Sequence, residues 1–175
     1  MKILKKFTIN YAGLADGEHF FDFFIDNKFF DFFKYSLIDQ AKIEVELKLI
    51  KFLDSLELNF SINGAVQVPC DLCLDEFDLA IISNDKINIK IVKNLPDDND
   101  PNLLYKLEGE NSINVAESIY ELISLSLPIR KVHPQNEDGQ SLCNPSMIKY
   151  LDQQTSFSEN DNESNPVWDE LKKLK

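Results

Sequence analysis

The stretch IEVELKL, from Ile43 to Leu49, alternates apolar and charged residues without a break. Successive side chains of a β-strand point to opposite faces, so this period of two predicts a strand with one buried face and one face in water. A sheet that contains such a strand is expected to be antiparallel, with a single face packed on the core. Further strands are predicted on both sides of this stretch, and they are expected to join the same sheet.

The same alternation returns downstream in three further stretches, 56–68, 77–81 and 87–91. Ser83-Asn84-Asp85 predicts a turn between the last two. Short connections between successive strands favour an antiparallel meander. Gly64 lies inside a strand, where a glycine predicts a bend or a bulge. Residues 103–107 are expected to return to the sheet as an edge strand.

Upstream, apolar residues at odd positions predict a first strand over residues 3–11 and a second over residues 18–25. Asp26 can cap a short helix over residues 27–35. Eight of the 13 phenylalanines fall between Phe20 and Phe33. This cluster is interpreted as a corner of the core where the helix closes over the sheet, because apolar surface patches of this size are uncommon. A partner-binding groove is the alternative.

A longer amphipathic helix is predicted after Asn114, which can act as the N-cap with Glu117 at the third helical position. Pro128 ends the helix. The apolar positions of this helix fall on one face, which favours packing against a sheet. The predicted fold class is therefore α+β: a curved antiparallel meander, conceivably barrel-like, with one main amphipathic helix and a short Phe-rich helix.

Composition divides the chain into three parts. Residues 1–150 hold most of the apolar residues and are predicted to form the α+β domain. Residues 151–164 are acidic and lack apolar periodicity, which is typical of a flexible linker. Residues 165–175 begin with Asn-Pro, a helix-start signal, and predict a short helical anchor. Three apolar residues share one face of this anchor and are candidate partner-binding residues: Trp168, Leu171 and Leu174.

The net charge is −12, with a sequence pI near 4.5. Proteins that hold nucleic acid by its phosphates need clustered Lys and Arg, so direct RNA binding is not expected. A basic protein partner is compatible with this charge. No run of 18 apolar residues and no signal-peptide pattern is present, which predicts a cytoplasmic protein without a membrane association.

Two of the three cysteines form a C-x-x-C pair, Cys70 and Cys73. An odd number of cysteines without a signal peptide argues against a disulfide framework and leaves metal binding, thiol chemistry or packing. His133 and Cys143 could complete a closed zinc site with three thiolates and one imidazole. The alternative is that His133 and Cys143 only pack, or lie exposed in a loop. His19 is interpreted as a partly buried strand residue.

An enzyme is not predicted, and no small-molecule substrate is expected. The sequence lacks a Gly-rich phosphate loop, a G-x-S-x-G elbow and an H-E-x-x-H motif. The rival hypothesis is a C-x-x-C thiol oxidoreductase. Acidic residues near the pair, such as Asp71 and Asp75, are expected to disfavour the thiolate that this chemistry needs.

Four features in this order resemble the YceD-like large ribosomal RNA subunit accumulation family: the Cys70 to Leu74 stretch, the helix from Glu117 to Pro128, the His133 to Cys143 segment and the closing Asn-Pro-x-Trp-x-x-Leu. The resemblance implies a non-catalytic factor needed for normal levels of large-subunit ribosomal RNA. With a net negative charge, such a factor is expected to bind a basic ribosomal protein or an assembly factor. A zinc-binding interaction module with another role is the alternative.

Overall fold

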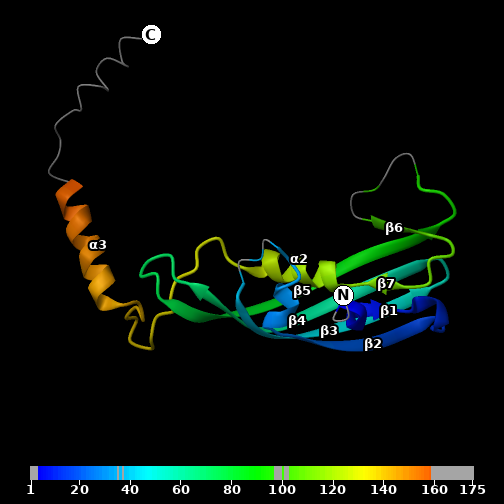
Figure 1. Ribbon diagram of the computed structural model, residues 1–175, viewed down its shortest axis with the longest axis horizontal. Coiled ribbons are helices and arrows are strands. Elements are labelled where there is room, and N and C mark those ends of the chain that lie inside the picture. Colours follow the sequence, from blue (N-terminus) through cyan, green and yellow to red (C-terminus); the bar gives the residue numbers. More distant parts are fainter. Residues whose placement is uncertain (1–3, 35, 37, 97–99, 101–102, 159–175) are drawn as a thin grey trace, which may run out of the picture. The chain divides into compact units, whose positions relative to one another are not determined.

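The computed structural model describes residues 4–34, 36, 38–96, 100 and 103–158 (Figure 1). The chain divides into two compact units. Unit 1 is drawn from residues 1–68 and 77–131, and unit 2 from residues 69–76 and 132–175. The boundary predicted at residue 150 stays a prediction. No helix in the described part of the chain is long and apolar enough to span a membrane.

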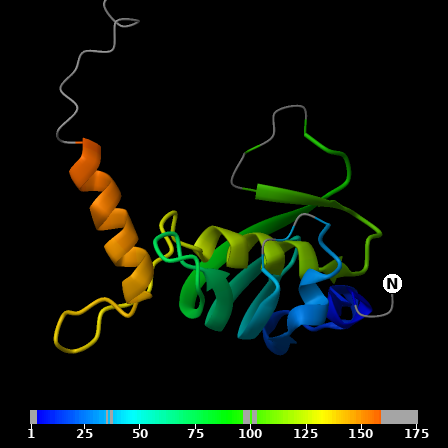
Figure 2. The same cartoon turned by 60° about the vertical axis from the view of Figure 1, so that its left-hand side comes forward.

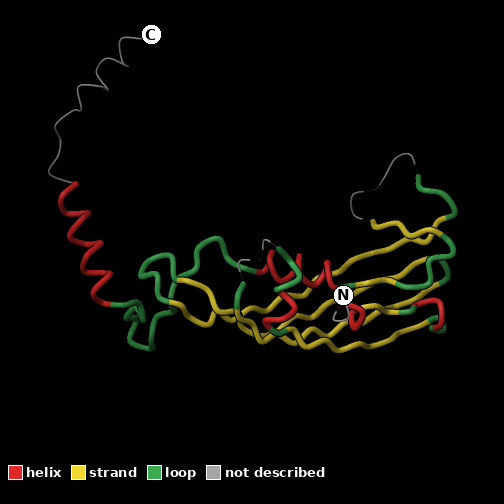
Figure 3. The backbone as a smooth tube through the Cα atoms, viewed as in Figure 1, coloured by secondary structure: helices red, strands yellow, loops and turns green. Residues whose placement is uncertain are grey.

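Unit 1 is built on a five-stranded sheet of order β2-β3-β4-β5-β6, which is drawn in yellow in Figure 3. The strands are β2 (Gly17–Ile25), β3 (Gln40–Phe52), β4 (Ser55–Pro69), β5 (Glu76–Val92) and β6 (Leu103–Leu107). Strand β3 pairs antiparallel with both β2 and β4. The fold class is therefore confirmed as α+β with a mostly antiparallel sheet, and the sheet is not closed into a barrel.

One prediction about this sheet is wrong, and one is confirmed with a strand direction that the sequence did not indicate. Ser83-Asn84-Asp85 is not a turn, because β5 continues through it as one strand. The Ser83 hydroxyl donates a hydrogen bond to the Asp85 carboxylate, so these polar side chains are satisfied along the strand itself. The edge strand β6 is present as predicted, but it pairs parallel to β5, with Asn88 opposite Leu103.

The N-terminal strand predicted over residues 3–11 is reduced to two residues. A 3-10 turn, η1 (Leu4–Phe7), precedes β1 (Thr8–Ile9), and a second turn, η2 (Tyr11–Gly13), follows it. Strand β1 pairs with β7 (Ile113–Asn114) in a separate two-stranded sheet. Phe7, Ile9 and Tyr11 are buried as the pattern predicts, but Phe7 and Tyr11 lie in the turns and not in a strand. Ile3 lies outside the described residues.

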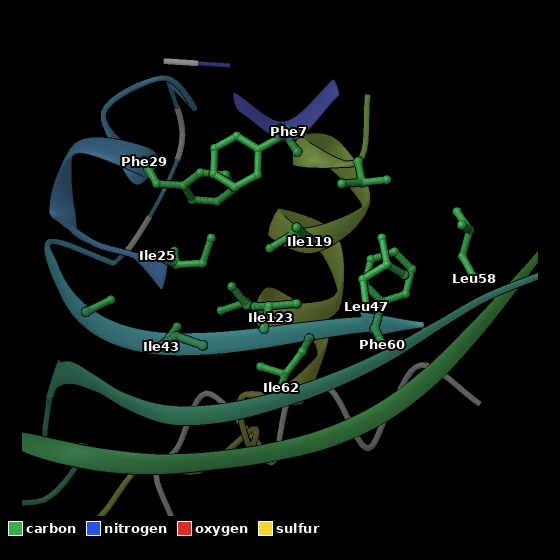
Figure 4. Packing of buried hydrophobic residues seen from close by; sticks show 14 of the residues in the cluster. Phe7, Ile25, Phe29, Ile43, Leu47, Leu58, Phe60, Ile62, Ile119 and Ile123 are labelled. Carbon is green, nitrogen blue, oxygen red and sulfur yellow. The ribbon is translucent and has the colours of Figure 1, made fainter. Parts of the chain in front are cut away.

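The core lies between one face of the sheet and the helices α1 (Asn27–Phe30) and α2 (Ala116–Ser126), as Figure 4 shows. Helix α1 is shorter than predicted, because its aromatic residues are weak helix formers and residues 31–34 continue as turns. Phe29 and Phe30 are nevertheless buried, so the corner of the core is confirmed. Helix α2 begins one residue later than an Asn114 cap would give, although the Asn114 side chain still accepts from the Ala116 amide at 2.9 Å.

Gly64 marks a close approach of two strands and not a bulge. The register between β3 and β4 pairs residues one for one across this position, with Ile43 opposite Gly64. A Cβ atom on Gly64 would lie 2.6 Å from the Cα atom of Ile43, and closer still to the carbonyl oxygen of Lys42. The strand therefore needs glycine here because the backbone of β3 occupies the space of a side chain.

Unit 2 contains a helix that the sequence analysis missed, α3 (Pro145–Ser158), which Figure 2 shows in orange. It corrects the predicted linker for residues 151–158, which are helical. The remaining linker residues and the predicted anchor at 165–175 lie outside the described residues. Composition failed here because a polar sequence of low hydrophobicity can still be helical when its start is capped.

Candidate metal centre

The loop between β4 and β5 folds the C-x-x-C pair into a tight turn. The Leu74 amide donates to the Cys70 carbonyl at 2.9 Å, and the Cys70 amide donates to the Asp75 carbonyl at 2.9 Å. Leu74 lies in the left-handed region, with φ of 65°. The Leu72 amide points at the Cys70 sulfur, 3.4 Å away. This turn holds the two cysteines on one side of the loop.

The segment from His133 to Cys143 folds back on itself like a hairpin. Gln135 and Ser141 form an antiparallel bridge, and the turn between them closes at Gly139, whose φ is 76°. The two ends of the segment are therefore close in space although they are ten residues apart. The sequence could predict this turn from Asn136-Glu137-Asp138-Gly139 but not the pairing across it.

The two segments bring all four predicted ligands together, and all four belong to unit 2. The sulfur and nitrogen atoms of Cys70, Cys73, His133 and Cys143 all lie within 4.8 Å of one another. The Cys70 and Cys143 sulfurs are 3.7 Å apart. The Nδ1 atom of His133 lies 3.4 Å from the Cys73 sulfur and 3.7 Å from that of Cys143. The cluster is therefore compact enough to hold a metal ion.

Asn144 joins the loop, the hairpin and the helix of unit 2. Its Oδ1 atom accepts a hydrogen bond from the Ser146 amide at 3.1 Å, which makes it a helix cap, and Pro145 follows at the first helical position. Its Nδ2 atom donates to the Asp75 carboxylate at 3.1 Å. The sequence analysis missed this residue, although Asn144-Pro145 carries the same signal that was interpreted as a helix start at Asn165-Pro166.

All three cysteines are free thiols and are buried, whereas His133 is partly exposed. Burial raises the pKa of the Cys70 thiol, but hydrogen bonds from the backbone of Cys73 and Leu72 lower it more, to about 6. The Ser141 hydroxyl lowers the pKa of Cys143, yet burial and the Cys70 sulfur raise it above its usual value. The lowered pKa of Cys70 and the raised pKa of Cys143 agree with a Cys143 thiol that donates a hydrogen bond to the Cys70 sulfur.

The low pKa of Cys70 corrects one expectation. Acidic neighbours were expected to disfavour the thiolate, but Asp71 and Asp75 are exposed to water, where their charge is screened. Backbone N–H groups, among them that of Leu72 at 3.4 Å from the sulfur, favour the charged form. The local turn therefore outweighs the charge of the surrounding sequence.

The other singled-out residues lie outside this cluster. His19 is a partly buried residue of β2, as predicted, and its Nε2–H donates to the Ala15 carbonyl at 2.9 Å. The candidate partner-binding residues Trp168, Leu171 and Leu174 lie outside the described residues.

A family model described as "Large ribosomal RNA subunit accumulation protein YceD" matches residues 58–175. The match spans more than half of the chain and contains the four clustered residues. Comparison with curated proteins and with solved structures gives no significant match.

Proposed function

Because the chain belongs to the YceD family of large ribosomal RNA subunit accumulation proteins, we propose that it is a cytoplasmic, non-catalytic factor that supports the accumulation of large-subunit ribosomal RNA. The observation that carries this proposal is the family match over residues 58–175. The matched region includes the metal-compatible cluster and the helices α2 and α3.

The factor acts by binding a basic ribosomal protein or an assembly factor. A net charge of −12 repels RNA phosphates and attracts proteins rich in Lys and Arg. Proteins that contact ribosomal RNA carry such basic surfaces, because they must neutralise phosphate. The effect on ribosomal RNA is then indirect, through the delivery or protection of a protein that binds it.

The metal that fits the cluster is zinc. Three sulfurs and one imidazole nitrogen are a typical ligand set for a closed structural zinc site. Zinc bonds of about 2.3 Å to sulfur and about 2.0 Å to nitrogen, at tetrahedral angles, separate two sulfurs by about 3.8 Å and a sulfur from a nitrogen by about 3.5 Å. The observed separations of 3.7 Å for the Cys70 and Cys143 sulfurs and 3.4 Å from the Cys73 sulfur to His133 Nδ1 agree with these values.

Zinc here has a structural role and ties the C-x-x-C turn to the hairpin. Among the described residues of unit 2, only the three cysteines are buried, because the buried hydrophobic core consists of residues of unit 1. Small units without a sufficient core are commonly stabilised by a metal.

The second candidate is a dithiol oxidoreductase, which the low pKa of Cys70 favours. Burial argues against it, since the Cys70 and Cys73 side chains are 0% and 1% exposed and a disulfide substrate could not reach them. A disulfide reductase activity that is lost in the variant Cys70→Ser would support this candidate over a structural site.

Depletion of the protein in its source organism tests the proposed role. The ratio of large-subunit to small-subunit ribosomal RNA is expected to fall, and the wild-type chain should restore it. A ratio that stays unchanged through depletion would contradict the proposal.

The predicted anchor at residues 165–175 is proposed to contribute to partner binding. Replacement of Trp168 by alanine is expected to leave the melting temperature of the full chain nearly unchanged and to weaken binding to proteins of the large ribosomal subunit. Large aromatic anchors commonly dominate a helix-in-groove contact. Val167→Ala is the matched control and should bind like the wild type. A large fall in melting temperature for Trp168→Ala would mean that the anchor packs on the protein itself.

A further inference from the structure

On strand β2, the outer face of the sheet, opposite the core, carries two exposed aromatic rings. Phe20 and Phe24 on β2 are 70% and 76% exposed, whereas the neighbouring Phe21 and Phe23 are partly buried against the core. The sequence analysis assigned the whole Phe cluster to the core, and these two residues, together with Phe32, which is 38% exposed, are exceptions to that interpretation. Exposed aromatic side chains that recur along one strand face are typical of interaction surfaces.

Three carboxylates lie among the two rings. Asp22 stands between Phe20 and Phe24 on the same face of β2, and the register places it directly opposite Glu46 of β3. Glu44 lies opposite Phe24. Like charges directly opposite each other destabilise a sheet, so the pairing of Asp22 with Glu46 is unfavourable in the free protein. The ion pairs in the described part of the chain involve Glu18, Glu57 and Glu110, and none of them includes Asp22, Glu44 or Glu46.

Two hollows lie on this face, one beside each ring. The first has a volume of about 410 Å³ and is lined by Phe20, Glu46 and Lys48, among others. The second has a volume of about 450 Å³ and is lined by Phe24 and Glu44, among others. Each hollow therefore combines an aromatic ring with carboxylates and with lysines, which are Lys48 and Lys86 in the first hollow and Lys42 in the second.

The protein itself contains an example of the chemistry that suits such a hollow. The ammonium group of Lys48 lies 5.9 Å from the centre of the Phe20 ring and 2.7 Å from the Glu18 carboxylate. A cation over an aromatic ring and beside a carboxylate gains from both contacts. Asp22, Glu44 and Glu46 offer the same contacts to cations from outside.

We propose that this acidic-aromatic face, formed by Phe20, Asp22, Phe24, Glu44 and Glu46, is the docking surface for a Lys- or Arg-rich segment of the basic partner protein. The inference rests on the proposed function, which requires a basic partner. Charge complementarity selects this occupant, because an incoming cation relieves the repulsion between Asp22 and Glu46. RNA phosphates and a second copy of this acidic chain would both increase that repulsion.

Carbodiimide crosslinking tests the inference, since the reagent joins carboxylates to lysines that are in direct contact. The full chain is mixed with proteins extracted from purified large ribosomal subunits and freed of RNA. Mass spectrometry should map crosslinks from Asp22, Glu44 or Glu46 to lysines of these proteins. The double variant Phe20→Ser, Phe24→Ser keeps every carboxylate and should lose most of these crosslinks. The control Phe52→Ser removes a ring that is 64% exposed at the end of β3, beyond the residues that pair with β2, and should keep them.

Binding of the same proteins to the double variant Asp22→Lys, Glu46→Lys should weaken by roughly 10-fold, as two exposed charge pairs are lost. The double variant Glu108→Lys, Glu121→Lys changes the net charge equally at exposed sites outside the face and should bind within about twofold of the wild type. If both double variants bind equally and the crosslinks map to carboxylates outside the acidic-aromatic face, the proposed docking surface is wrong. The proposed function would not be affected by that result. Failure of the wild-type chain to bind any of these proteins would overturn both, and crosslinks between two copies of the chain would overturn the choice of occupant.

Discussion

Replacement of Cys73 by serine is expected to abolish the proposed zinc binding by the full chain and to unfold unit 2. Structural zinc sites contribute roughly 10–16 kcal/mol, so the loss of one of four ligands is expected to cost on the order of 3 kcal/mol, or more than about 100-fold in affinity. Hydrogen exchange should then lose protection in the 134–142 hairpin and in α3. The sheet of unit 1 should stay protected, because its hydrophobic core consists of residues of unit 1.

The two histidines provide the matched control for this experiment. His133→Asn removes a cluster nitrogen and should lose zinc as Cys73→Ser does. His19→Asn removes only a hydrogen bond to the Ala15 carbonyl and should retain one zinc ion per chain. Full zinc content in Cys73→Ser, with unchanged protection of unit 2, would mean that the cluster does not bind zinc through these residues.

Replacement of Gly64 by alanine will destabilise unit 1 by about 1–3 kcal/mol, the usual cost of forcing extra atoms into a packed region. The new methyl group would lie 2.6 Å from the Cα atom of Ile43, and a backbone neighbour cannot rotate away as a side chain can. Urea unfolding followed by far-UV circular dichroism measures this loss. The signal reports strands, which suits a unit built mainly on a sheet.

Gly13→Ala is the control for Gly64→Ala. A Cβ atom on Gly13 would meet nothing nearer than 3.9 Å, so its stability is expected to stay within about 0.5 kcal/mol of the wild type. Equal stability of the two variants would show that β3 and β4 can separate at Gly64 without cost.

The centre of the sheet could be predicted from sequence because burial there follows a strict period of two. Ile43, Val45 and Leu47 are buried in β3, and the polar residues between them are not. The same signal failed at the N-terminus, where Phe7 and Tyr11 are buried in 3-10 turns and not in a strand. Periodicity reports which side chains are buried, whereas the hydrogen-bonding partner of the backbone depends on the rest of the fold.

Contacts between distant segments account for the other differences. The parallel pairing of β6 leaves no mark in its own sequence, since one short strand fits either direction. The exposure of Phe20 and Phe24 depends on which face of β2 the helices cover. The residue types of the four-residue cluster could be selected from the sequence, because few other soft ligands exist, but the hairpin that closes it depends on pairing between Gln135 and Ser141.

Affinity purification of the full chain from cells, with and without RNase, tests most directly whether the protein acts through a protein partner and not through RNA. We expect a basic protein of the large ribosomal subunit, or an assembly factor, to remain bound after RNase treatment, and to be retained less by the double variant Asp22→Lys, Glu46→Lys. The loss of every partner on RNase treatment would contradict this account and would mean that RNA tethers the protein to its complexes.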